Sequence, residues 1–237
     1  MNEVSRPKGT DLYHYGYRPV PFVNRNPFSR SDLQLNDVNT AKRRGAPRRD
    51  EPTARERLIA AVGELFYQEG VHAVGVDTVS ERSGVSKSSL YRTFASKDDL
   101  IAAFAEDQNR RYWEWWDQTI KAHQGHPRRQ IEALLAGVAH QIGQPNFRGC
   151  PFINLAAELA DPKHPALAIT CGNKQEVRAR LRRLSRELGA REPDRLGDQL
   201  SLLMDGAYGR TLTLGAKGLQ RELLEMAKLL MDVQTAR

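Results

Sequence analysis

Several features are scarce or absent in this 237-residue sequence, and each absence narrows the class of protein. No apolar run approaches the ~20 residues that a membrane-spanning helix needs, so we expect no membrane partner. The chain begins without the apolar core of a secretory signal, and it contains only two cysteines, Cys150 and Cys171. These features exclude a disulfide-built secreted fold and favour a protein of the reducing cytoplasm.

Signals for catalysis and for cofactor binding are equally scarce. The sequence has no glycine-rich phosphate loop, no paired-carboxylate signature and no nucleophile elbow. His123 and His126 stand just before a proline, but no acidic or thiol residue accompanies them at a metal-ligand spacing. We therefore expect no enzyme activity, no cofactor and no metal site, and we interpret the histidine pair as solvent-exposed.

Positive charge, by contrast, is in excess, with a net charge of +7 at pH 7. Residues 1–50 combine many prolines with no sustained hydrophobic period, so we expect a disordered N-terminal extension. The stretch that starts at Val38 has the composition expected of a protein's N-terminus. We therefore expect translation to start near Val38 and residues 1–37 to be dispensable. The densest basic run follows it and is either a solvated tail or an arm that neutralises DNA phosphates. Its members are Lys42, Arg43, Arg44, Arg48 and Arg49.

From Thr53 onward the sequence predicts helices almost without interruption, and the expected fold class is all-α. Leu58, Val62 and Leu65 repeat at helical spacing, and a glycine ends this first helix. Serines and prolines mark the starts of most later helices, and Asp77 is expected to cap the second. The expected helices cover 54–69, 78–83, 87–93, 97–122, 127–143, 151–160, 165–189, 193–215 and 218–234.

Two short helices that meet around Gly84 carry the functional signal. Leu90 and Phe94 are expected to face inward, which leaves short hydroxyls, one phenol and two cations on the outer face of the second helix. Such a face suits a helix in the major groove of DNA, because hydroxyl and guanidinium groups reach base edges while other polar groups reach phosphates. The pattern alone is also compatible with two ordinary surface helices. The outward residues are Lys87, Ser88, Ser89, Tyr91 and Arg92.

Residues 54–100 resemble the DNA-binding domain of the TetR/AcrR family of transcriptional regulators. The matching segments are RLIAAVGELFYQEG, VDTVSERSGVSKSSLYRTF and ASKDDL. The resemblance implies a helix-turn-helix domain over 51–97 and a helical ligand-binding and dimerisation domain over 98–237. It also implies groove contacts from Lys87, Ser88, Ser89 and Arg92, and phosphate contacts from Thr78, Tyr91 and Lys97.

The same resemblance implies a homodimer that binds double-stranded DNA at a palindromic operator. The implied regulator is a repressor that a small organic ligand releases from the operator. The alternative is a DNA-binding protein regulated by a protein partner. A closed, fully packed interior would favour this alternative. In the family the last two long helices form the dimer, and these correspond to about 193–215 and 218–234. The small residues Gly206, Ala207 and Gly209 would let helices approach closely.

The effector site is expected beside the long fourth helix, where Trp113 and Trp116 share a face and Trp115 points elsewhere. An aromatic-rich pocket with a few polar groups suits a planar or amphipathic organic molecule. For each residue of the expected lining, the competing interpretation is that it packs in the hydrophobic core and binds no ligand. The expected lining consists of Trp113, Trp116, His140, Phe152, Asn154, Met204 and Tyr208.

Two further features of the C-terminal half have simpler interpretations. The arginines of 165–189, among them Arg178 and Arg182, are interpreted as a solvated surface. Cys150 lies on a loop between Arg148 and a proline, and we interpret it as a structural cysteine, with a reactive thiol as the alternative.

Overall fold

The structure, a computed structural model, describes residues 51–236. Within this range the chain forms nine α-helices and no β-strand, so the all-α class is confirmed. The helices are α1 (Ala54–Glu69), α2 (Val76–Ser83), α3 (Lys87–Thr93), α4 (Lys97–Lys121), α5 (Pro127–Ile142), α6 (Pro151–Glu158), α7 (Pro165–Glu187), α8 (Pro193–Leu214) and α9 (Leu219–Thr235).

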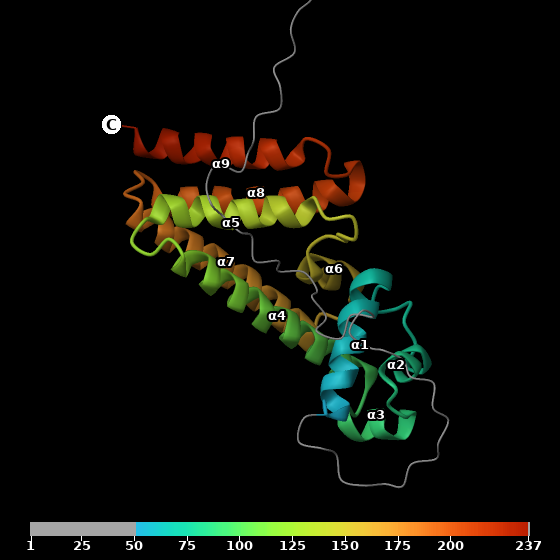
Figure 1. The fold of residues 1–237 in the computed structure, drawn as a ribbon. Helices are drawn as coiled ribbons and strands as arrows, with labels where there is room; N and C mark the ends of the chain where they lie inside the picture. Colours follow the sequence, from blue (N-terminus) through green and yellow to red (C-terminus); the bar gives the residue numbers. More distant parts are fainter. Residues whose placement is uncertain (1–50, 237) are drawn as a thin grey trace, which may run out of the picture.

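The helices are arranged as two connected parts (Figure 1). α1, α2 and α3 gather at one end of the molecule, while α5, α8 and α9 lie along one another at the opposite end. α4 and α7 pack side by side and run between the two ends. α4 is therefore the direct chain link from the first three helices to the rest of the molecule.

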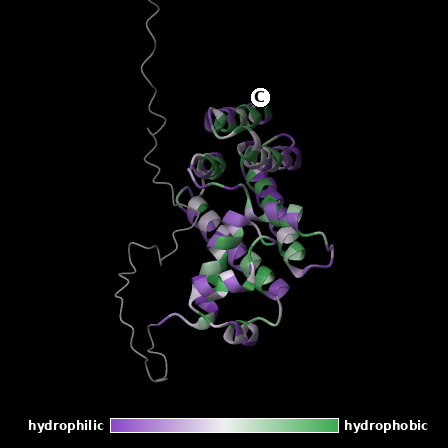
Figure 2. Cartoon of the chain, turned by 90° about the vertical axis from the view of Figure 1, so that its right-hand side faces the viewer, coloured by the Kyte–Doolittle hydropathy of each residue, from purple (hydrophilic) through white to green (hydrophobic). Residues whose placement is uncertain are grey.

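Two hydrophobic clusters stabilise these parts, because the helices are amphipathic and each buries one face. Figure 2 shows hydrophobic and hydrophilic residues mixed along the helices. The N-terminal cluster joins α1, α2 and α3 to the first turns of α4 and includes Leu58, Leu90 and Phe104. The C-terminal cluster joins the rest of α4 to α5, α7, α8 and α9 and includes Trp116 and Leu181.

Local capping explains most helix boundaries, but the start of α2 differs from the expectation. Thr53 caps α1: its hydroxyl accepts the Glu56 N–H at 3.2 Å, and the Glu56 carboxylate accepts the Thr53 N–H at 2.7 Å. α2 begins at the residue before Asp77, so the prediction that Asp77 caps it is wrong. Gly75 takes the N-cap position without a side-chain hydrogen bond, and the Asp77 carboxylate pairs with the Lys87 ammonium instead.

Trp115 is buried against α5 at Gly137, where an added Cβ would lie 2.6 Å from the indole ring. One expectation for the C-terminal part is also wrong, because α8 is covered on more sides than helical spacing reveals. Ala207 is buried in the chain's own C-terminal cluster, so it does not form a surface for a second subunit. The neighbouring Gly206 is exposed instead.

Candidate nucleic-acid interface

α2 and α3 meet at a tight turn whose backbone conformation favours glycine. Gly84 ends α2 with φ 64° and ψ 20°, in the left-handed region. Ser86 then caps α3, because its hydroxyl accepts the Ser89 N–H at 3.3 Å. Val79 and Leu90 are buried in the N-terminal cluster and anchor the two helices. This frame holds the opposite face of α3 in solvent.

The solvent face of α3 is polar along its whole length. Ser88 is exposed, and its hydroxyl lies 3.1 Å from the hydroxyl of Ser86. The exposed Arg92 donates from Nη2 to Ser89 Oγ at 2.8 Å, so its guanidinium lies along the helix. Tyr91 is 52% exposed although it is aromatic. This face presents hydroxyl, phenol and guanidinium groups of the kinds that contact base edges and phosphates in DNA.

The other residues expected to contact DNA flank α3. Lys87 opens α3 and forms an ion pair with Asp77 of α2, and both side chains are more than half exposed. Thr78 is exposed on α2, and Lys97 is the partly exposed first residue of α4. All seven candidate residues therefore lie on α2, on α3 or at the start of α4. Their contacts with DNA stay a prediction.

Arg55 adds a cation that the pattern of residues 76–100 could not reveal. The start of α1 lies beside α3 (Figure 1), and the Arg55 guanidinium is 5.7 Å from the centre of the Phe94 ring. Its place in the first turn of α1, soon after the basic run, was the available signal. That run, Lys42, Arg43, Arg44, Arg48 and Arg49, lies outside the described residues.

Hydrogen bonds join α1 to the loop before α6, and the turn after α1 to the last residue of α6. The Tyr67 hydroxyl donates to the Gly149 carbonyl at 3.0 Å and accepts the Arg148 N–H at 2.9 Å. Burial raises the pKa of Tyr67 to about 12, so the phenol keeps its proton and both bonds at neutral pH. At the other end of α6, the Glu158 carboxylate accepts the Val71 N–H at 2.6 Å. A change in the position of α6 would therefore reach the helix that supports α3.

The residues expected to form an effector pocket do not share one cavity. Phe152 and Tyr208 line a cavity of about 10 Å³ beside α6. Trp116 and Met204 are packed inside the C-terminal cluster and do not line it. Room of this size suits a single water molecule, so the described conformation has no space there for a planar organic ligand.

The other three candidates make contacts of their own. Trp113 is partly buried, and the Arg180 guanidinium lies 4.1 Å from its ring centre. His140 is partly buried, and its ring Nε2 lies 3.2 Å from the Gln144 amide nitrogen. Asn154 donates to a carbonyl in the loop before α6 at 2.7 Å. A ligand-binding role for these residues stays a prediction.

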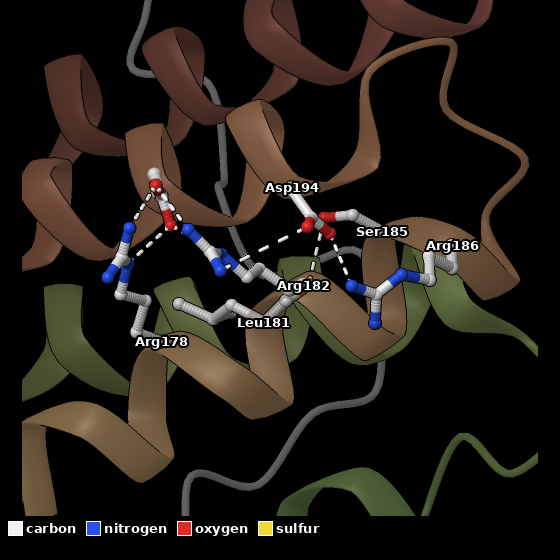
Figure 3. Close-up of polar contacts among 7 residues, drawn as sticks. Arg178, Leu181, Arg182, Ser185, Arg186 and Asp194 are labelled. Atoms are coloured by element: carbon white, nitrogen blue, oxygen red, sulfur yellow. Dashed lines mark hydrogen bonds and ion pairs between the residues drawn. The ribbon is translucent and has the colours of Figure 1, made fainter.

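Three arginines of α7 are paired with carboxylates of α8 (Figure 3), so they are more than a solvated surface. Arg178 and Arg182 each donate two hydrogen bonds to the Asp198 carboxylate, at 2.6 or 2.7 Å. Arg186 pairs with Asp194 in the first turn of α8. One carboxylate thus accepts from two guanidiniums and joins the two helices.

Neither a metal site nor a membrane span is evident in residues 51–236. No cluster of three or more histidine, cysteine, aspartate or glutamate side chains is placed to hold a metal ion in this range. None of its helices is both long enough and apolar enough to cross a bilayer.

Comparisons with known proteins agree with this geometry. Residues 58–104 match the family model described as bacterial regulatory proteins, tetR family. A putative TetR regulator from Streptomyces avermitilis is 34% identical, and the match covers 77% of this chain and 98% of that one with a TM-score of 0.68. A TetR-family regulator from Streptomyces coelicolor is 28% identical over 77% and 96% of the two chains, with a TM-score of 0.70.

A curated relative matches a shorter stretch. The transcriptional activator FasR of Mycolicibacterium smegmatis is 42% identical over 78 residues, which are 28% of this chain and 35% of FasR. The Streptomyces avermitilis match, by contrast, covers nearly all of that regulator. The segment matched by the family model runs from α1 into α4 and includes the whole polar face of α3. The chain therefore belongs to the TetR family of DNA-binding transcriptional regulators.

Proposed function

We propose that this regulator acts in the cytoplasm as a homodimer that represses transcription from a palindromic operator and is released by a small organic ligand. Regulators of this family are not enzymes, so the function is one of binding. The observation that carries the proposal is the polar, exposed face of α3, held on a frame that Gly84 and Leu90 stabilise.

In this proposal the N-terminal half of α3 enters the major groove. Lys87 then exchanges Asp77 for DNA, and Arg92 turns from Ser89 towards a base edge. Base contacts come from Lys87, Ser88, Ser89 and Arg92, and phosphate contacts come from Thr78, Tyr91 and Lys97.

Helices α8 and α9 supply the proposed dimer interface. Leu202 of α8 and Met226, Leu229 and Val233 of α9 are each at least 45% exposed. The three residues of α9 follow one another at helical spacing and so share a face. Monomers rarely keep large apolar patches in water, and a two-fold partner would bury the same patch on both copies. It would also set two α3 helices about one DNA turn apart, ~34–36 Å.

Release by a ligand requires a second conformation. A ligand that binds preferentially to a state with another spacing of the α3 helices shifts the population away from DNA. Such a state must open the C-terminal cluster around Trp116, because the present cavity holds about one water molecule. In this proposal the domain of residues 51–97 binds DNA, and the domain of residues 98–237 binds the ligand and dimerises.

The packed interior also favours a second candidate function, regulation by a protein partner. In that case a protein that binds the outer faces of α4 to α9 would change the spacing of the α3 helices. Titration of the operator complex with candidate organic molecules and with protein fractions separates the two candidates. Release by a small molecule supports the first, and release by protein alone supports the second.

Selection of duplexes from a random pool by the purified full chain tests the DNA-binding proposal. We expect an enriched palindrome with half-site centres about one helical turn apart. A pool without enrichment, or a single asymmetric half-site, would contradict it. The sign of regulation is then read from a reporter placed behind the selected sequence; because the relative FasR is named an activator, increased expression is the outcome that would overturn repression.

The basic run before α1 is proposed as an arm on DNA phosphates. Removal of residues 1–50 should flatten the salt dependence of operator binding by up to ~0.9 log units for each phosphate that the arm no longer neutralises. Removal of residues 1–37 is the matched control, because it keeps all five basic residues and should leave folding and binding intact. If operator affinity depended on salt equally in the chains that lack residues 1–50 and residues 1–37, the basic run would not contact phosphates and would be a solvated tail.

A further inference from the structure

A thiol lines the cavity beside α6, and an ammonium group lies near it. Cys150 is only 5% exposed, stands at the N-cap of α6 and lines the cavity. Lys174 of α7 lies near enough to Cys150 for the ammonium and the sulfur to interact, and it pairs with Asp205 of α8 at 2.6 Å. The Lys174 Nζ also lies 5.8 Å from the ring centre of Tyr208, which lines the same cavity. A cation is thus held at a buried sulfur by groups from two helices.

An amide in the same cavity has an unused donor. Gln141 of α5 is 3% exposed, and its Oε1 accepts from the Tyr208 hydroxyl at 3.4 Å. Its Nε2 is buried and has no hydrogen-bond partner among the described residues. A buried donor without an acceptor is unfavourable, so the cavity favours an occupant that carries an acceptor oxygen.

The size of the cavity limits that occupant. About 10 Å³ is room for one water molecule, which excludes organic effectors and leaves small polar species. The chemistry of the site points in the same direction, because the lining offers the Cys150 sulfur as a nucleophile and the Gln141 amide as a donor for an oxygen, and the Lys174 ammonium nearby is a second donor.

We propose that Cys150 is a modification site at which hydrogen peroxide oxidises the thiol to a sulfenic acid. The thiol first gives its proton to solvent, and the sulfur then attacks one peroxide oxygen. The S–O bond forms as the O–O bond breaks, so the sulfur loses two electrons and the peroxide gains them. The leaving hydroxide takes a proton from Lys174 and departs as water, and Lys174 recovers its proton from solvent. The new S–OH oxygen accepts from Gln141 Nε2.

The modified residue is adjacent to the link with the DNA-binding helices. Gly149 precedes Cys150 with φ +85°, and an added Cβ there would lie 2.9 Å from a Leu212 methyl carbon, so this turn has little free space. The Gly149 carbonyl accepts from Tyr67 of α1. The new oxygen is fixed both to the Cys150 sulfur and by its hydrogen bond to Gln141, so Cys150 and the crowded turn before it shift, and Tyr67 carries the displacement to α1. This consequence rests on the proposed function, whereas the oxidation itself does not.

The two cysteines of the chain allow a matched experiment. Cys171→Ser keeps only the buried thiol, and Cys150→Ser keeps only the exposed one. Both full-length proteins are treated with hydrogen peroxide in the presence of dimedone, and the adduct is followed by mass spectrometry. We expect the buried Cys150 to form the adduct at least about tenfold faster than the exposed Cys171, since a positioned proton donor adds a rate factor of about 10²–10⁴. Equal rates, or a faster Cys171, would overturn the proposal.

Lys174 is tested as the residue that positions and donates the proton. In the Cys171→Ser background, Lys174→Gln should slow adduct formation roughly 100-fold, and Lys174→Arg should restore part of the rate. Circular dichroism of each variant shows whether it is folded. A folded Lys174→Gln protein with an unchanged rate would remove Lys174 from the reaction and overturn the proposed step.

The effect on DNA is measured separately on the selected operator. Peroxide should lower the affinity of Cys171→Ser protein at least about tenfold, dithiothreitol should restore it, and Cys150→Ser protein should not respond. Tyr67→Phe in the Cys171→Ser background should still be oxidised but should retain its DNA affinity. Oxidation of Cys150 without any change in DNA affinity would refute the coupling and leave the chemistry standing. If the unoxidised protein binds no operator, the proposed function is wrong. The dimedone assay still shows whether Cys150 is oxidised, because it does not depend on DNA binding.

Discussion

At the residue scale, the proposed DNA contacts of α3 divide into side chains that would read bases and side chains that would neutralise phosphates. Arg92→Ala should weaken binding to the selected operator by ~1–3 kcal/mol and change binding to scrambled DNA much less, because a base contact contributes only at the right sequence. Tyr91→Phe is the comparison, since removing a hydrogen bond to phosphate should weaken both complexes evenly. Gel-shift titrations on both duplexes provide the test; an equal reduction for Arg92→Ala would assign Arg92 to the phosphates.

At the same scale, we expect the ion pair between Asp77 and Lys87 to weaken DNA binding. Asp77→Asn should strengthen binding to all DNA by up to roughly fivefold, because an exposed ion pair contributes ~0.2–1 kcal/mol and a negative charge beside phosphates is removed. The gain should shrink as salt rises. Glu69→Gln, an exposed carboxylate at the far end of α1, is the control and should have little effect. Weaker binding by Asp77→Asn would show that the carboxylate positions Lys87 for DNA.

At the element scale, local signals predicted most of the fold because they act within one turn of the chain. Ser86 caps α3 as expected, and Pro127 and Pro193 begin α5 and α8 as expected. The start of α2 was missed, because Asp77 bonds to a residue of the next helix rather than to its own helix end. The burial of Trp115 also depends on another element, since its indole ring packs on α5 at Gly137.

The candidate sites divide in the same way. The polar face of α3 could be predicted because its pattern is contained in seven consecutive residues. The hydrogen bond from Tyr67 to Gly149 joins residues 82 positions apart, and no local pattern announces it. Likewise, Cys150 and Gln141 line one cavity, and Lys174 lies near Cys150; because the three residues come from three different elements, their proximity depends on the packed bundle.

Asp198 provides a test of how α7 and α8 hold together. The guanidiniums of Arg178 and Arg182 keep the pKa of Asp198 well below its usual range. The pKa of Asp198 is lower in the folded state than its value of ~3.9 in the unfolded chain. The ion pairs therefore contribute fully to the free energy of unfolding above about pH 4, and this contribution is lost as the pH falls towards the folded-state pKa. Asp198→Asn should therefore lower the free energy of unfolding at pH 7, and its difference from wild type should narrow below about pH 4.

Thermal unfolding followed by circular dichroism at pH 7, 5 and 3 measures this difference. Asp194→Asn is the matched control, since Asp194 lies on the same helix and pairs with Arg186 at a more exposed position. We expect a smaller effect from it than from Asp198→Asn. A difference between wild type and Asp198→Asn that stayed constant down to pH 3 would exclude the ion pairs as its cause.

At the scale of the whole molecule, the two ends have complementary tasks. The polar face of α3 and the apolar faces of α8 and α9 lie at opposite ends, joined by α4 and α7 (Figure 1). Each α3 reads only a few base pairs, so the affinity of a regulator for its operator depends on two copies acting together. In the proposed dimer, a displacement of α6 or α4 relative to α8 and α9 therefore changes the spacing of the two α3 helices.

A charged side chain introduced by mutation at the centre of the proposed dimer interface tests that interface. Leu229→Glu on α9 should produce a monomer with unchanged helix content, because the side chain is exposed in the single chain but would lose its hydration between two copies. Operator affinity should fall roughly 100-fold or more as the two half-sites lose their link. Leu214→Glu is the matched control: Leu214 is also exposed, but helical geometry turns it about 120° from Leu202 around α8. Sedimentation equilibrium at micromolar concentration gives the mass. A Leu229→Glu protein that stayed dimeric, or a wild-type protein that sedimented as a monomer, would place the interface elsewhere or remove it.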